Sequence, residues 1–177
     1  DGAYGIALLA RAKYSYDSQY NVVRLTLLRS PTEPAYNVDE GEHNITYSLY
    51  PHKGDWRNDV VQKGHEFNHP LIALVEKQHK GVLPKTGSFI RVEPENIIVT
   101  CIKKAEDDRS LIMRLYESTG IEAEARITLN LNKMIKESYK TNILEDEVLE
   151  KIEVNGNKLK FLAKPYEIIT IKNVLEQ

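Results

Sequence analysis

Apolar and polar side chains alternate along most of the chain. The alternation is clearest where Ala125, Ile127, Leu129 and Leu131 are separated by polar residues. Because successive side chains of a β-strand point to opposite faces of a sheet, this period of two predicts strands with one buried and one exposed face. Runs rich in β-branched and aromatic residues predict further strands: Tyr4–Leu9, Val22–Leu28, Ile45–Tyr50, Ile97–Lys103, Leu111–Tyr116, Lys158–Leu162 and Ile168–Lys172.

A hairpin is predicted at Asn155-Gly156. This pair separates Ile152–Val154 from Leu159–Phe161, and two further polar residues complete the link. Asn-Gly readily takes the positive φ angles of a tight hairpin turn.

One helix is predicted, from Arg57 to Asn68. Val60, Val61 and Phe67 recur there at helical spacing, although Gly64 weakens the helix.

The segment between Leu71 and Gly87 has the most linker-like composition of the chain, with prolines and glycines close together. It predicts a boundary near residue 88, with one domain over 1–87 and a second over 88–177. About seven short strands in the second domain fit a small β-sandwich. We expect its core to contain the apolar phase of the alternation: Cys101, Met113, Leu115, Ile127, Leu129 and Phe161.

The composition excludes several classes of protein. The 177 residues are 41% hydrophobic, enough for a core, and 24 basic against 26 acidic residues give a net charge of −2. A nucleic-acid partner is therefore not expected. No apolar stretch reaches the length of a membrane span, so we expect a cytoplasmic protein without a membrane partner.

The single cysteine and the first residues also bear on the class. Cys101 lies in the apolar run Ile97–Ile102 and has no partner for a disulfide within the chain, so a structural thiol is expected. The sequence begins at Asp1 without methionine and soon enters the apolar stretch Ile6–Leu9. We therefore expect a fragment of a longer protein.

His65-Glu66-Phe67-Asn68-His69 matches a zinc-peptidase motif, in which two histidines one helical turn apart bind zinc and the glutamate is the general base. Pro70 directly follows, and the residue before a proline is disfavoured in helical geometry. We expect the second histidine to lie outside the helix.

A third zinc ligand is also hard to find. The extended motif of one peptidase class needs glycine and histidine where this chain has Ile72 and Val75. Glu93 and Glu95 flank a proline in an apparent turn. A zinc peptidase is thus the weakest of the alternatives, and no metal site is predicted in this chain.

Short words spread over nearly the whole chain carry a resemblance, and their order and spacing are more specific than any one of them. They are Tyr4–Leu9, Lys13-Tyr14, Leu25–Pro31, Asp39–His43, Thr46–His52, Gly54–Trp56, Asn68, Pro70-Leu71, Glu95-Asn96, Ile102–Ala105, Arg114–Glu117 and Pro165–Ile168. In this order the chain resembles the C-terminal region of family 38 α-mannosidases, in the branch of bacterial, archaeal and cytosolic members.

The resemblance implies an all-β chain. Its first part would be the remaining part of a large β-supersandwich of the galactose-mutarotase-like kind, and its second part a small immunoglobulin-like β-sandwich. Members of the family are retaining α-mannosidases, with one carboxylate as nucleophile and another as general acid/base. A zinc ion held by His and Asp ligands grips the sugar hydroxyls.

Those residues belong to the family's N-terminal α/β barrel, and none of them maps onto this chain. The resemblance therefore implies no catalytic residue, no metal and no cofactor here, with zinc in the parent's missing domain. It implies two partners: the catalytic barrel of the same polypeptide and, through the parent, a mannoside. Alone, the fragment is expected to be inactive.

Three residues are the candidates for proximity to substrate. The family often places an arginine near the sugar pocket at the end of the strand that corresponds to Leu25–Leu28, which implies this position for Arg29. Asp39 and His43 belong to a polar loop that follows. The alternative for Arg29 is an ion pair at a domain contact, and the alternative for the loop is a solvated turn.

The chain departs from the family at Ala10-Arg11, where relatives usually carry Asn-Asp, and at Ser15, where they usually carry glycine. Any role of that aspartate at the mouth of the active site is lost or rebuilt here. A stand-alone carbohydrate-binding module is the other alternative. Such modules usually expose aromatic rings to sugars, and Trp56 is the only indole.

Overall fold

The structure is a computed structural model that describes residues 2–176. It divides into two units, and the division falls between Glu76 and Lys77. The first strand of the second unit begins at Ile90, just after the position near residue 88 that the composition marks. Strands are the main regular structure of both units, and the first unit adds one short helix, so the all-β prediction is confirmed.

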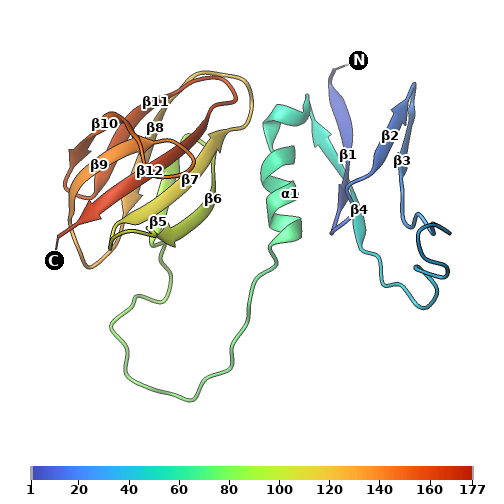
Figure 1. Cartoon of the computed structure of the whole chain (residues 1–177), viewed down its shortest axis with the longest axis horizontal. Helices are drawn as coiled ribbons and strands as arrows, with labels where there is room; N and C mark the ends of the chain where they lie inside the picture. Colours follow the sequence, from blue (N-terminus) through green and yellow to red (C-terminus); the bar gives the residue numbers. More distant parts are fainter. Residues whose placement is uncertain (1, 177) are drawn as a thin grey trace. The chain divides into compact units, whose positions relative to one another are not determined.

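The first unit contains two separate two-stranded sheets (Figure 1). Strand β1 (Tyr4–Ala10) pairs antiparallel with β4 (Tyr47–Lys53), and β2 (Tyr16–Gln19) pairs with β3 (Val22–Leu25). The 3₁₀ turn η1 (Trp56–Asn58) precedes helix α1 (Val60–Asn68). The Asn68 side chain donates to the Ala10 carbonyl at 3.3 Å and so joins the end of α1 to β1.

This first unit has almost no core. Among its described residues, Ala10 is the only hydrophobic residue that is fully buried, and every residue of β2 is exposed. Ile6 and Leu49, on the paired strands, are 69% and 65% exposed. Two-stranded sheets are rarely stable alone in water, so the unit has the character of one part of a larger sheet structure.

The second unit is a continuous ladder of eight strands folded into two layers (Figure 1). Their order is β5-β8-β11-β10-β9-β12-β7-β6. Strand β10 joins the layers, because Val148–Ile152 pairs with β9 and Glu153–Asn155 pairs with β11. The bounds are β5 Ile90–Glu93, β6 Ile97–Lys104, β7 Leu111–Glu117, β8 Ala123–Leu129, β9 Ile135–Thr141, β10 Val148–Asn155, β11 Lys158–Ala163 and β12 Ile168–Leu175.

The core of this sandwich consists of the apolar phase of the alternation. Five of the six residues predicted for it are buried, namely Met113, Leu115, Ile127, Leu129 and Phe161. Ile169 and Ile171 of β12 join the same cluster. Alternation in these strands therefore identifies the inner face correctly.

The prediction for Cys101 is wrong, because its side chain is only half-buried and lies outside the core cluster. A β-bulge at Thr100 is the cause. Val99 pairs with the core residue Leu115, whereas Cys101 pairs with Arg114. One extra residue moves every following side chain to the opposite face of the sheet.

The predicted helix and hairpin both exist with different bounds. Asp59 lies between η1 and α1, so the helix is shorter than Arg57–Asn68. The β10–β11 hairpin turns at Gly156 and Asn157, with Asn155 paired to Lys158. Gly156 has φ +59°, the only positive φ of the two, which is the pattern of a turn with glycine in the first central position.

Candidate functional site

An open groove of about 790 Å³ lies beside the β2–β3 ribbon. Its walls are the two segments that continue the ribbon beyond its paired residues, and the amide of Thr26 donates to the Ser15 carbonyl at 3.0 Å to hold them together. Residues that line the groove are Ala12, Lys13, Tyr14, Ser15, Tyr16, Thr26, Leu27, Leu28, Arg29 and Asp39. The predicted strand Val22–Leu28 ends early, at Leu25, and its remainder forms this wall.

Two of the three candidate residues line this groove, and the third contacts one of them. The Ser30 amide donates to Asp39 Oδ2 at 2.7 Å, which brings the polar loop back to the end of the Arg29 segment. His43 Nε2 lies 2.9 Å from the Asp39 carbonyl oxygen. The three candidates, which the sequence offers separately, therefore lie at one location in space.

The guanidinium of Arg29 is exposed and, within residues 2–176, forms no hydrogen bond or ion pair. Its neighbour Arg24 is different, because Arg24 pairs with Asp17 across the β2–β3 ribbon. An unpaired guanidinium presents a planar set of donors that suits two sugar hydroxyls or a carboxylate.

Two tyrosines add aromatic surface to the groove. Tyr14 is 93% exposed and Tyr16 is 46% exposed. Aromatic rings pack against the apolar faces of pyranoses, while guanidinium, carboxylate and hydroxyl groups bind sugar hydroxyls. The groove thus carries groups suited to a carbohydrate, but no arrangement of nucleophile, acid and base is found among its described residues.

The two histidines of the His65–His69 motif do not both lie in helix α1. Helix α1 ends at Asn68, and His69 is its C-cap with φ −120° and ψ 74°, as Pro70 predicts. His69 Nδ1 lies 2.9 Å from the His65 carbonyl oxygen, and the two rings stack with centroids 5.9 Å apart. No group of three metal-binding side chains occurs among the residues that the structure describes.

Residues from three of the words that carry the family resemblance meet at one buried carboxylate, Glu117. Its Oε1 accepts hydrogen bonds from Asn96 Nδ2 at 2.8 Å and from the Thr119 amide at 2.7 Å. Its Oε2 accepts from the amides of Gly120 at 2.7 Å and Tyr166 at 3.0 Å. Glu117 therefore joins three turns at one end of the sandwich, a structural role that the sequence alone does not reveal.

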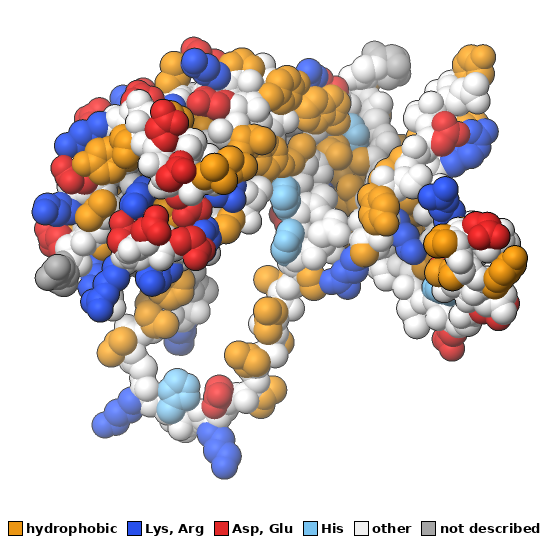
Figure 2. Space-filling model, viewed as in Figure 1, with side chains coloured by type: hydrophobic (Ala, Val, Ile, Leu, Met, Phe, Trp, Pro, Cys, Tyr) orange, Lys and Arg blue, Asp and Glu red, His pale blue; other side chains and the backbone are white. Residues whose placement is uncertain are grey.

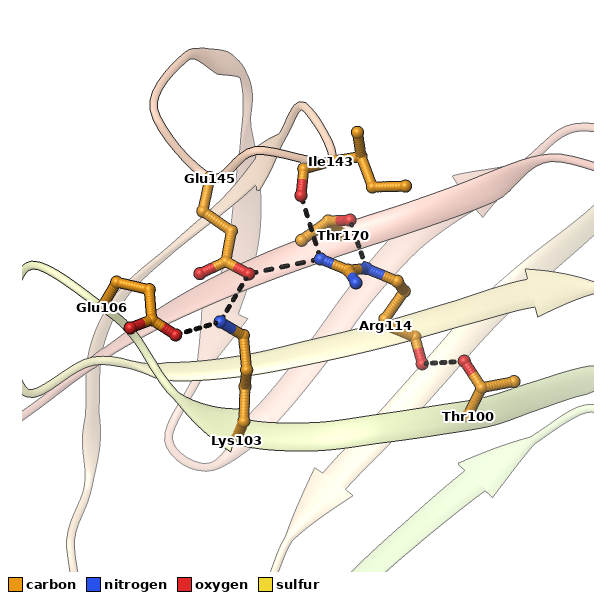
Figure 3. A network of polar contacts seen from close by, with 7 residues as sticks. All are labelled: Thr100, Lys103, Glu106, Arg114, Ile143, Glu145 and Thr170. Carbon is orange, nitrogen blue, oxygen red and sulfur yellow. Dashed lines mark hydrogen bonds and ion pairs between the residues drawn. The ribbon is translucent and has the colours of Figure 1, made fainter.

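A second polar network lies on the outer face of β6, β7 and β12 (Figure 3). Glu145, in the loop between β9 and β10, forms ion pairs with Lys103 at 3.1 Å and Arg114 at 3.2 Å. Arg114 also donates to the Ile143 carbonyl at 3.0 Å and to the Thr170 hydroxyl at 3.3 Å. The network fastens this loop over the outer face of the sheet.

The second unit thus has the fold of a small β-sandwich domain. Comparison with protein families specifies the class further. Residues 96–171 match the family described as "Glycosyl hydrolases family 38 C-terminal beta sandwich domain".

Known proteins match over nearly the whole chain. The chain is 34% identical to "Alpha-mannosidase G" of Dictyostelium discoideum, over 96% of this chain and 16% of that protein. It is 31% identical to "Alpha-mannosidase 2C1" of Homo sapiens, over 98% of this chain and 17% of that protein. The crystal structure of an α-mannosidase from Enterococcus faecalis V583 has the same fold, with a TM-score of 0.76 and 20% identity over 97% of this chain and 20% of that one.

The chain belongs to glycoside hydrolase family 38 and corresponds to its C-terminal β region. It spans about one sixth of the length of the two relatives named above.

Proposed function

We propose that this chain is the C-terminal structural part of a retaining α-mannosidase that hydrolyses terminal α-mannosides. One observation carries the proposal: relatives named α-mannosidases match 96% and 98% of the chain but only 16% and 17% of their own length. The chemistry would belong to the rest of the parent, in a barrel that holds the nucleophile, the general acid/base and a zinc ion.

The groove is proposed to form one wall of the sugar pocket in the parent. Its exposed tyrosines and the unpaired Arg29 support this role, because they offer stacking surface and hydrogen-bond donors together. We further propose that the parent is cytoplasmic, which the single cysteine supports. In the part described, no helix combines the length and apolarity that a membrane crossing requires.

The test compares the purified chain with its parent on an aryl α-mannoside, each with and without added zinc. The parent should turn over the substrate and the isolated chain should not. Turnover that survives re-purification and follows the chain would contradict the proposal, as would a pure, zinc-loaded parent that leaves α-mannosides intact.

A stand-alone carbohydrate-binding module remains the second candidate, favoured by the exposure of Tyr14 and Tyr16. Calorimetry of the isolated chain against mannose and α-mannobiose separates the two functions. Structural wall residues without their barrel should give no measurable heat, whereas a complete module would bind in the millimolar range or tighter.

A further inference from the structure

The run Leu71-Ile72-Ala73-Leu74-Val75 is apolar and fully exposed. Leu71 and Val75 have essentially the exposure of residues in an extended peptide, and Ile72 and Leu74 are more than 80% exposed. Figure 2 shows hydrophobic side chains along this segment, which Figure 1 draws as an extended chain after α1. Single exposed leucines are ordinary, but five consecutive apolar residues in water are not.

The backbone amides and carbonyls of this run also lack hydrogen-bond partners among the described residues. Residues 71–75 have no secondary structure, and no hydrogen bond joins them to any other described residue. Amides and carbonyls of an apolar, extended segment commonly find partners by adding to a sheet edge. The segment has both the side chains and the free backbone for such an addition.

We propose that Leu71–Val75 is a docking arm, covered in the parent by the part of the polypeptide that precedes this region. Relatives of this chain are about six times longer, so most of the parent lies outside the structure. The inference rests on the proposed function only in requiring that longer parent.

The small apolar area of Leu71–Val75 favours a segment of the same polypeptide over a second copy of the chain as the group that covers it. A stable association of separate molecules buries roughly 800 Å² on each partner, and five side chains alone supply less than that. A segment of the same polypeptide needs far less area, because the covalent connection provides a high effective concentration.

The experiment uses the parent and the isolated chain, each in three forms. The arm variant carries Leu71→Ser, Ile72→Ser, Leu74→Ser and Val75→Ser. The matched control changes the next polar residues of the same segment, with Lys77→Ser, Gln78→Ser, His79→Ser and Lys80→Ser. Hydrogen exchange of residues 71–76 and the thermal midpoint are measured for all six proteins.

In the isolated chain, these amides should exchange as in an unfolded peptide, and neither variant should change the midpoint. In the parent, exchange should be at least about a hundredfold slower. The arm variant should lower the parent's midpoint and remove this protection, while the control does neither.

Two outcomes would overturn the proposal. One is exchange in the parent as fast as in the isolated chain. The other is an isolated chain that dimerises in light scattering and loses the dimer in the arm variant, which would assign the arm to a second copy. Because neither readout requires catalysis, a parent without α-mannosidase activity would refute the proposed function and leave the docking arm intact.

Discussion

At the scale of single residues, Glu117 shows how a buried charge is stabilised. Burial alone would raise the pKa of its carboxyl group, but hydrogen bonds from Thr119, Tyr166 and Asn96 outweigh burial and lower it to about 2. The side chain is completely buried. The charged form is therefore the one that the fold requires.

The lowered pKa predicts how stability depends on pH. A glutamate in the unfolded chain has a pKa near 4.3, so below that value the unfolded state binds the extra proton. Glu117 should thus stabilise the second unit fully above about pH 5, and this stabilisation should disappear as the pH falls toward 2. The difference corresponds to about 3 kcal/mol.

Glu117→Gln tests this dependence, because glutamine keeps the shape and removes the charge. An amide nitrogen in place of one oxygen would face backbone N–H donors, so the loss at neutral pH should be about 2–4 kcal/mol. Urea unfolding between pH 2 and pH 7 measures it. The exposed Glu122→Gln is the control, and an equal acid slope in wild type and Glu117→Gln would refute the assignment.

Gly120 supports the same cluster and gives a second prediction. Its φ is +76°, and a Cβ there would lie 2.5 Å from the ring of Tyr166. The exposed Tyr166 ring can move away, so Gly120→Ala should destabilise the second unit by about 1–2 kcal/mol, mainly through the strain of alanine at this positive φ.

Gly64 of α1 is the matched control, because an added Cβ meets no atom within 4 Å. Gly64→Ala should stabilise the helix by about 0.5–1 kcal/mol. Thermal unfolding of both variants decides the matter. Equal effects in the two positions would contradict the strain assigned to alanine at the positive φ of Gly120.

At the scale of elements, alternation predicts the long apolar strands well and the short or polar ones poorly. Strand β8 lies where apolar residues alternate, and β6, β7, β11 and β12 lie in runs rich in apolar residues. Strand β9 was not predicted, because Lys136, Ser138 and Lys140 break the apolar phase that the inner face should show. Ser138 is buried there because its hydroxyl donates to Asn173 at 2.9 Å, a partner 35 positions away.

The bulge at Thr100 is a second feature that the sequence alone does not predict. Thr100 lies inside the apolar run Ile97–Ile102, and only the pairing with β7 shows that one residue is extra. A register shift depends on the partner strand, which explains why the sequence alone placed Cys101 on the wrong face.

We predict that Glu145 stabilises the loop between β9 and β10. Glu145 has a side chain that is only 10% exposed and pairs with two cations, and its backbone has φ +71°. Glu145→Gln should cost about 1–3 kcal/mol and speed exchange of the amides in the loop, because the partly buried Arg114 loses its counter-charge and Lys103 keeps only Glu106.

Glu106→Gln provides the control for that prediction. Glu106 also pairs with Lys103, but its side chain is 84% exposed. Its loss should therefore cost less than about 0.5 kcal/mol. Similar losses in both variants, by urea unfolding, would mean that the loop is not held by Glu145.

At the scale of the whole molecule, the two units differ in how much hydrophobic core they contain. The second unit has a continuous core, whereas the described part of the first has one fully buried hydrophobic residue. The pattern of apolar residues predicts a unit with a core, such as the second, because a buried sheet face requires apolar side chains at regular positions. It says little about the first unit, in which apolar residues of the paired strands, such as Ile6 and Leu49, are exposed.

The sequence predicts only some residues of the candidate site. The family resemblance indicates Arg29 and the polar loop supplies Asp39 and His43 as separate candidates, and the structure places the three close together. Tyr14 and Tyr16 were missed as groove residues, because neither tyrosine is distinctive in a chain with ten of them. Their position follows only from the pairing of β2 with β3.

The last prediction concerns Arg29 in the parent enzyme. Arg29→Ala should lower kcat/KM by about ten- to a hundredfold, because a charge-assisted hydrogen bond made in the transition state contributes roughly 1.5–3 kcal/mol. Arg24→Ala is the matched control, since Arg24 lies on the adjoining strand and already pairs with Asp17. Steady-state kinetics and thermal midpoints of both variants separate the alternatives. If Arg29 instead holds this region against the barrel, the midpoint should fall while activity per folded molecule stays normal, and Arg29 would then be a structural residue.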